Sequence, residues 1–142
     1  MLGVFSAMEV SASGLTAERT RMNTIASNLA NAHTTRTASG QPYKRIDPVF
    51  EAVMLDRTQA SNGSNGVSMV KVQKIVEDTR QGQLVYEPGH PDANPQGYVE
   101  YPNVNVVEEM VNMLTASRAY EAGVTSVESI KGMAKTAIDI GR

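Results

Sequence analysis

Cysteine and tryptophan are both absent from this chain of 142 residues, and phenylalanine occurs twice. Without cysteine the chain can form neither a disulfide framework nor a thiolate metal site. The scarcity of bulky aromatic side chains leaves little volume for a large globular core. The apolar content comes instead from alanine, valine, methionine and leucine, which suit long helices that pack closely together.

A strong charge imbalance is also missing, because 13 Lys and Arg stand against 15 Asp and Glu, a formal net charge of −2. Nucleic-acid binding requires a clustered basic surface, so this balance argues against it. No apolar run approaches the eighteen or so residues of a membrane span. The amino terminus lacks a basic region and Glu9 interrupts its apolar run, so we expect no cleaved secretory signal.

Proline is absent from residues 2–31, where apolar residues recur every seven positions. This heptad spacing predicts a helix that packs in the manner of a coiled coil. Gly3 and Gly14 each weaken the helix by about 1 kcal/mol relative to alanine, so we expect it to need a packing partner. The first heptad row consists of Met8, Leu15, Met22 and Leu29, and a second row, broken by Arg19, of Phe5, Ala12 and Ala26.

A second proline-free segment runs from about residue 104 to residue 140, and we expect Asn103 to cap it as a helix. The two helices would be roughly 45 and 55 Å long, so in an antiparallel pair the second would outrun the first by about two turns. An apolar stripe left over at a chain end usually meets another subunit. Two interleaved heptad rows are formed by Val106, Met113, Tyr120, Val127 and Ala134, and by Met110, Ser117, Val124, Lys131 and Ile138.

The residues between these helices have a different composition, with six prolines between residues 42 and 102 and polar clusters such as Ala60–Gly66. Short β-like runs separate the prolines and polar clusters, and the first has Phe50, Ala52 and Met54 on one face. We expect the run at residues 67–76 to pair with the run at 83–86 across the polar turn at 77–82. The proline-rich stretch Tyr86–Met110 predicts a rigid, extended connector, which would also set the angle between the insert and the second helix.

We therefore predict an α+β chain with long N- and C-terminal helices paired as a coiled coil and a small β-rich domain inserted between them. The expected divisions are an N-terminal helix at residues 1–33, a β-rich insert with a proline-rich elbow at 34–101, and a C-terminal helix at 102–142. An insert of this size buries little apolar surface by itself, so it would rely on the helices beside it.

No residue pattern indicates catalysis or metal binding. His33 and His90 are the only histidines, and neither has a second ligand at helical spacing, so we expect loop histidines with local hydrogen bonds. Glu108 and Glu109 are adjacent on a helix and cannot share a proton, so a solvated or inter-subunit face is the expectation for the helix carboxylates. Neither glycine-rich stretch matches a phosphate-binding loop or a dinucleotide fingerprint.

The methionines of the two helices leave two readings open. A methionine stripe at helical spacing is usually core, but its flexible side chains also tolerate inexact neighbours, as in a surface that packs against related subunits. Both readings apply to Met8, Met22, Met110, Met113 and Met133.

Two stretches carry a family resemblance. The segment "SNLANAHTT" at residues 27–35, after a heptad helix, resembles the signature of the flagellar rod and hook proteins. The segment from residue 84 to residue 124, "LVYEPGHPDANPQGYVEYPNVNVVEEMVNMLTASRAYEAGV", looks like the carboxy-terminal half of the proximal rod proteins of that family. The second stretch is much more specific than the first, and the resemblance covers nearly the whole chain. One departure is Gly123, where the family pattern favours asparagine and where a glycine predicts a helix bend.

The resemblance implies a structural subunit of the flagellar basal body that is not an enzyme and needs no cofactor or metal. Members of this family are exported unfolded, without a cleaved signal, through the flagellar type III apparatus. They polymerise through their terminal helices into the torque-transmitting rod that crosses the periplasm and forms the wall of the export channel. The implied partners are other copies, other rod proteins, the export apparatus and the membrane ring at the rod base, with no nucleic acid and no small-molecule substrate.

Asn28 and Asn31 can hydrogen-bond the backbone or a neighbouring chain, so we expect them to fix the register of the assembly. An alternative function is a coiled-coil adaptor or export chaperone of a type III system, which shares the stripes but needs neither the elbow nor the insert. The expected assembly interface consists of Met8, Leu15, Met22, Asn28, Leu29, Asn31, Val106, Met110, Met113, Tyr120, Val124, Val127 and Ile138.

Overall fold

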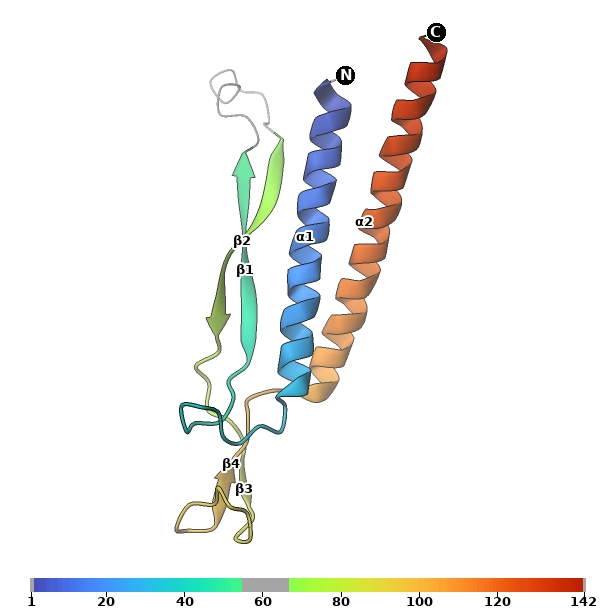
Figure 1. The fold of residues 1–142 in the computed structure, drawn as a ribbon. Coiled ribbons are helices and arrows are strands. Elements are labelled where there is room, and N and C mark those ends of the chain that lie inside the picture. The colour runs from blue at the N-terminus through green and yellow to red at the C-terminus, as the bar shows by residue number, and fades with distance from the viewer. Residues whose placement is uncertain (1, 55–66, 142) are drawn as a thin grey trace.

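A computed structural model describes residues 2–54 and 67–141 of the chain, so the polar cluster at residues 60–66 lies outside the described residues. Two long helices, α1 (Leu2–Ala30) and α2 (Val106–Ile140), flank the strands in sequence. Figure 1 shows the helices side by side, with both chain ends at the same end of the molecule. Their chain directions are therefore antiparallel, and α2 extends beyond the start of α1. The predicted α+β architecture of packed terminal helices around a β insert is confirmed.

Helix α1 is continuous although it contains many polar side chains. Thr16, Thr20 and Thr24 each donate a hydroxyl hydrogen bond to the carbonyl four residues earlier, which satisfies these groups within the helix itself. The helix ends at Ala30, where the side chain of Asn31 donates to the carbonyl of Ser27. This contact satisfies one of the carbonyls left free in the last turn.

Helix α2 begins two residues later than the sequence suggested, and Asn105, not Asn103, is its cap. Asn105 has an extended backbone, and its side-chain oxygen accepts from the N–H groups of Val107 and Glu108. Asn103 is already engaged with other loops and is not free to cap a helix. The helix then continues without interruption through Gly123.

The strands form two separate antiparallel ribbons. Strand β1 (Ile46–Met54) pairs with β2 (Ser68–Glu77), with a bulge between Val49 and Phe50. Strand β3 (Leu84–Tyr86) pairs with β4 (Tyr98–Glu100). The expected pairing of β2 with β3 is therefore wrong. The segment between them makes no tight turn, because Asn103 holds the carbonyls of Asp78 and Arg80.

The proline-rich stretch after residue 86 folds back on itself, which contradicts the prediction of an extended connector. The amide of Glu87 bonds to the carbonyl of Gly97, and the side chain of Asn94 accepts from the amides of Gln96 and Tyr98. Gly97 has a φ of 84°, a conformation that side chains rarely adopt. The stretch thus forms a compact loop between β3 and β4, at the end of the molecule away from the chain termini (Figure 1).

Helix α1 is the middle of three layers, with the β1–β2 ribbon on one side and α2 on the other (Figure 1). The two neighbouring layers cover one of the two heptad rows of α1 and leave the other exposed. Met8, Leu15, Met22 and Leu29 are half-buried, whereas the second row, Phe5, Ala12, Arg19 and Ala26, is exposed.

Few residues are fully enclosed by these layers. Among the described residues the buried apolar side chains are small or medium in size, and three polar side chains are buried with them. The two sets are Ala17, Ile25, Ala32, Val99 and Ala116, and Thr24, Asn28 and Glu109. Burial of apolar surface is the main favourable term in folding, so this chain obtains only a modest stability from its own core.

Gly123 allows the two helices to approach closely. A β-carbon built on Gly123 would lie 2.8 Å from Cδ2 of Leu15, closer than such carbons pack. Gly132, also within α2, would meet no atom within 4 Å. A leucine from α1 therefore packs against the bare backbone of α2 at Gly123.

We predict opposite effects from the same substitution at these two glycines. Gly123→Leu lowers the free energy of unfolding by about 1–3 kcal/mol, because it overpacks the helix interface at Leu15. Gly132→Leu raises it by about 0.5–1 kcal/mol, because leucine has the higher helix propensity and meets no neighbour. Urea unfolding followed by circular dichroism measures both. A Gly123→Leu variant as stable as Gly132→Leu would contradict this packing of the helices.

Candidate assembly junction and interface

Glu109 is a charged side chain buried inside the chain, where the sequence suggested a solvated or inter-subunit carboxylate. It lies in the first turn of α2 and is only 1% exposed. Its neighbour Glu108 is exposed. The expectation of a solvated or inter-subunit carboxylate is wrong for Glu109, because this residue faces α1 and the start of β1. A buried carboxylate is tolerated only with charged and hydrogen-bonding partners.

Asn28, near the end of α1, supplies one of these partners and is fully buried. Its amide nitrogen donates to Oε2 of Glu109 at 3.1 Å and to the carbonyl of Ile46 at 2.9 Å. Its amide oxygen accepts from the N–H of Ile46 at 3.0 Å and from the hydroxyl of Tyr43 at 3.0 Å. The side chain of Asn28 thus links the end of α1 by hydrogen bonds to the start of β1 and to the start of α2.

Arg45, immediately before β1, supplies the opposite charge. Its Nε donates to Oε1 of Glu109 at 2.7 Å, and its Nη1 pairs with Asp47. Partial burial opposes the charge of Arg45, but the hydrogen bonds to Glu109 and Asp47 outweigh it and raise the pKa of the guanidinium above its ordinary value. We call Asn28, Arg45 and Glu109 the junction cluster.

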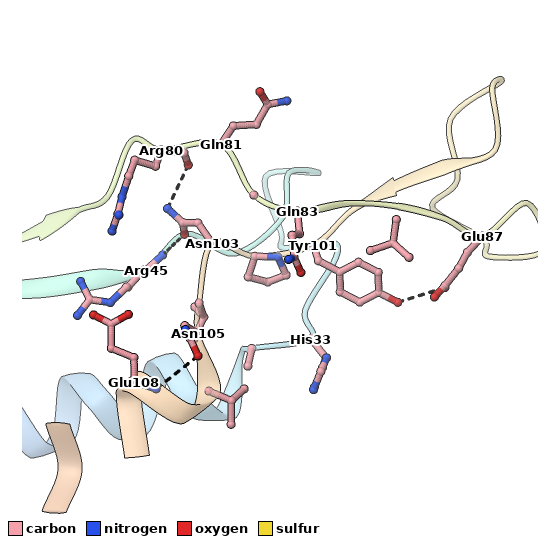
Figure 2. Close-up of a pocket in the computed structure, with 16 residues that line it drawn as sticks. His33, Arg45, Arg80, Gln81, Gln83, Glu87, Tyr101, Asn103, Asn105 and Glu108 are labelled. Carbon is pink, nitrogen blue, oxygen red and sulfur yellow. Dashed lines mark hydrogen bonds between the residues drawn. The ribbon is translucent and has the colours of Figure 1, made fainter. Parts of the chain in front are cut away.

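Asn103 extends this junction to the loop after β2 (Figure 2). Its side-chain oxygen accepts from the N–H of Arg45 at 2.8 Å, and its nitrogen donates to the carbonyls of Asp78 and Arg80. Asp78 accepts hydrogen bonds from the side chain of Arg80, which has the larger effect, and from the backbone N–H of Arg80. These bonds lower the pKa of the Asp78 carboxyl to about 2. Asn103 therefore connects three segments that are far apart in the sequence.

An open pocket of about 830 Å³ lies between this loop, the start of α2 and the β3–β4 arm (Figure 2). Its wall contains Gly82, whose backbone approaches Tyr101 so closely that a β-carbon would sit 1.8 Å from the Tyr101 carbonyl oxygen. His33 and His90 both pack near the Tyr101 ring, and Nδ1 of His90 accepts from the amide of Asp92. Across residues 2–54 and 67–141, no group of three or more His, Cys, Asp or Glu side chains could hold a metal ion.

The expected interface residues fall into three groups. Asn28 is buried in the junction cluster, and Asn31 bonds only to nearby groups, the Ser27 carbonyl and the Thr34 hydroxyl. The half-buried apolar positions are Met8, Leu15, Met22, Leu29, Met113, Tyr120, Val124 and Val127. The exposed positions are Val106, Met110 and Ile138.

An exposed apolar patch lies on the first two turns of α2, and Met110 is the one residue of it among the expected interface residues. Val107, Met110, Val111 and Leu114 are between 56% and 71% exposed. They lie at spacings of three, four and seven residues, which places them on one face of the helix. This face is opposite the one that carries Glu109 and Ala116, both buried. We call these four residues the outer patch.

Comparisons with known proteins find similarity to flagellar basal-body rod proteins at both ends of the chain and over nearly its full length. A family described as "Flagella basal body rod protein" matches residues 8–36, and one described as "Flagellar basal body rod FlgEFG protein C-terminal" matches residues 96–140. The flagellar basal-body rod protein FlgC of Bacillus subtilis (strain 168) is 42% identical, over 97% of this chain and 98% of the relative. Those of Borreliella burgdorferi and Salmonella typhimurium are 41% and 38% identical, again over at least 98% of each chain.

We predict that the two asparagines of the "SNLANAHTT" motif differ in their contribution to stability. Asn28→Leu lowers the free energy of unfolding by about 2–4 kcal/mol, because it leaves Glu109 and the Ile46 backbone without their partners. Asn31→Leu, the matched control, costs about 1 kcal/mol or less because its contacts are local and partly exposed. Urea unfolding of both variants measures the difference, and equal losses would contradict the junction described above.

Proposed function

Because this chain belongs to the FlgC family of flagellar basal-body rod proteins, we propose that it polymerises through its helices into the rod, where it transmits torque and lines the export channel. The family is structural, and its members are not enzymes. The β1–β2 ribbon and the β3–β4 arm would lie outside the helical layer and contact the surroundings of the rod.

The outer patch is the observation that carries this proposal. Four large apolar side chains on two turns of a helix, each more than half exposed, are an unfavourable surface for a chain that stays free in solution. Within the described residues no element of the chain covers them. Packing against a neighbouring rod subunit would remove this surface from water, at about 25 cal/mol for each Å² of apolar area buried.

The far end of α2 supports the same proposal. Met133, Ile138 and Ile140 are each more than 60% exposed there. Figure 1 shows this end of α2 extending past the start of α1, so α1 cannot cover the last residues. A neighbouring subunit in the rod would bury this second apolar region, as the sequence-based expectation of an unpaired stripe requires.

A small core also suits the proposed export route. A chain that passes unfolded through a narrow channel must unfold at low cost. This chain has no cysteine, and few of its described residues are fully buried. We propose export through the flagellar type III apparatus without a cleaved signal. Assembly in the periplasm would then involve other copies, other rod proteins and the membrane ring at the rod base. None of the described helices is long and apolar enough to cross a membrane.

We predict that charge on the outer patch blocks assembly without unfolding the chain. Val111→Glu places a carboxylate on an exposed apolar position, so the fold is unchanged but burial against a neighbour becomes unfavourable. The matched control is Ser129→Glu, five turns further along the same face of α2, where the surface is already polar. Cells lacking their own copy should become motile with the control variant but not with Val111→Glu.

Two measurements complete this test. Circular dichroism of the purified variants should match the parent chain, and isolated basal bodies should contain Ser129→Glu but not Val111→Glu. Normal motility and normal incorporation of Val111→Glu would rule out the outer patch as an assembly surface.

A further inference from the structure

One face of α1 stays exposed over nearly the whole length of the helix. Its eight residues recur at alternating spacings of four and three, which is the spacing of a coiled-coil seam, and all eight are exposed. The largest apolar side chain among them, Phe5, is 67% exposed. We call these residues the α1 outer row: Phe5, Glu9, Ala12, Thr16, Arg19, Asn23, Ala26 and Ala30.

A second row with the same spacing runs along the outside of α2. It begins in the outer patch, with Met110 and Leu114, and continues to Lys135. Six of its eight residues are exposed, and Ser117 and Val124 are half-buried. We call these residues the α2 outer row: Met110, Leu114, Ser117, Glu121, Val124, Glu128, Lys131 and Lys135.

The two rows match each other residue by residue when the helices run antiparallel. From Ala30 backward and from Met110 forward, the spacings follow the same order, so a single register places every residue of one row opposite a residue of the other. The eight opposed pairs are Ala30–Met110, Ala26–Leu114, Asn23–Ser117, Arg19–Glu121, Thr16–Val124, Ala12–Glu128, Glu9–Lys131 and Phe5–Lys135.

Charge selects this register over its neighbours. Both charged residues of the α1 outer row lie opposite the opposite sign, Arg19 at Glu121 and Glu9 at Lys131. A slide of one heptad in either direction keeps the spacing in phase but places Glu9 opposite an apolar residue. These residues are Val124 and Ile138. Within residues 2–54 and 67–141, none of the four paired charges has an ion-pair partner, so all four are available to another molecule.

Side-chain size agrees with the same register. The two large apolar residues of the α2 outer row, Met110 and Leu114, are 60% and 56% exposed and lie opposite the alanines at 30 and 26. A large side chain opposite a small one allows two helices to approach closely and removes the large one from water. At the other end, the aliphatic stem of Lys135 can cover the ring of Phe5.

We propose that the α1 outer row of one copy packs antiparallel against the α2 outer row of a second copy, with Leu114 opposite Ala26 and Glu121 opposite Arg19. This inference rests on the proposed function, since it names the two surfaces that meet in the assembly.

This contact arranges neighbouring copies in parallel and nearly level. Because α1 and α2 are antiparallel within a copy, a neighbour's α2 that is antiparallel to α1 runs in the same direction as the first copy's α2. Within one chain Asn28 meets Glu109, and between copies Ala30 would meet Met110. The two registers therefore differ by about three residues, or about 4–5 Å along the helix axis.

The contact is also heterologous. Each copy uses its α1 outer row toward one neighbour and its α2 outer row toward another. Heterologous contacts of this kind generate rings or open helical filaments, depending on the rotation and rise between neighbours.

Disulfide trapping tests both the contact and its register, because the chain has no cysteine of its own. A tagged full-length copy with a cysteine on α1 and an untagged copy with a cysteine on α2 are expressed together in cells that lack the native copy. Basal bodies are isolated and oxidised. The opposed pairs, Asn23→Cys with Ser117→Cys and Thr16→Cys with Val124→Cys, should each give a dimer that contains both chains.

The same four variants supply the control when the partners are exchanged. Asn23→Cys with Val124→Cys and Thr16→Cys with Ser117→Cys are each one heptad out of register, about 10 Å along the axis. These dimers should be at least tenfold weaker than those of the opposed pairs. Equally strong exchanged pairs, or variants that enter basal bodies without forming any dimer, would overturn the proposal.

Charge exchange tests the ionic part of the contact. Arg19→Glu and Glu121→Arg change exposed residues, so circular dichroism should show both variants folded. Each should reduce incorporation into basal bodies, and the double variant should recover much of it because the pair is restored with reversed charges. Losses that simply accumulate in the double variant would contradict a direct pairing of these residues.

The parent chain distinguishes the two levels of the account. If the parent itself never enters basal bodies, the proposed function is wrong. If the parent enters them while opposed and exchanged cysteine pairs behave alike, only this inference is wrong.

Discussion

The architecture depends on the burial of one negative charge. Glu109 sits at the start of α2 with almost no exposure, and a carboxylate in that position requires partners from elsewhere in the chain. Arg45 brings the start of β1, and Asn28 brings the end of α1, so three elements separated by up to 81 residues meet at one point. Removing one partner leaves the charge uncompensated, which makes this contact far more demanding in geometry than an apolar contact of the same size. The junction cluster therefore fixes the relative positions of the helices and the β1–β2 ribbon.

The polar contacts that fix the geometry of the fold are gathered at one end of the molecule. Along the remaining length of the helices, apolar surface stays exposed. Away from the junction the layers are held by small side chains and by close approach at Gly123, and the fully buried apolar set is short. The larger apolar side chains face outward on α2 and on the β1–β2 ribbon. A chain built in this way is weakly stabilised alone and gains burial when it meets others. That division suits a rod subunit, whose remaining apolar surface would be buried by its neighbours in the assembly.

The sequence predicted what depends on local patterns. Heptad spacing and the absence of proline located both helices, and the family resemblance agreed with the later comparisons. The extended connector failed because of short-range contacts within residues 87–98. The other failures concern contacts between distant residues. Glu108 and Glu109 are chemically identical, and only the packing of α1 and β1 determines which one is buried. Asn103 and Asn105 are equally good helix caps by residue type, but the side chain of Asn103 hydrogen-bonds the loop after β2 and is not available as a cap. The predicted pairing of β2 with β3 is wrong for the same reason, because the residues between them form that loop and not a tight turn. The outer patch has a three–four spacing that the sequence already contains, but the heptad rows include only Met110 of its four residues.

Hydrogen exchange on the full-length chain, free and in isolated basal bodies, tests the central claim most directly. The account predicts that in the free chain amide protection is strongest around the junction cluster, at residues 24–32, 43–49 and 105–116, and weak toward both chain ends. In basal bodies, protection should extend along the rest of α1 and along α2 toward Ile140. Strong and uniform protection of both helices in the free chain, with no gain on assembly, would contradict a chain that is fixed at one polar junction and completed by its neighbours.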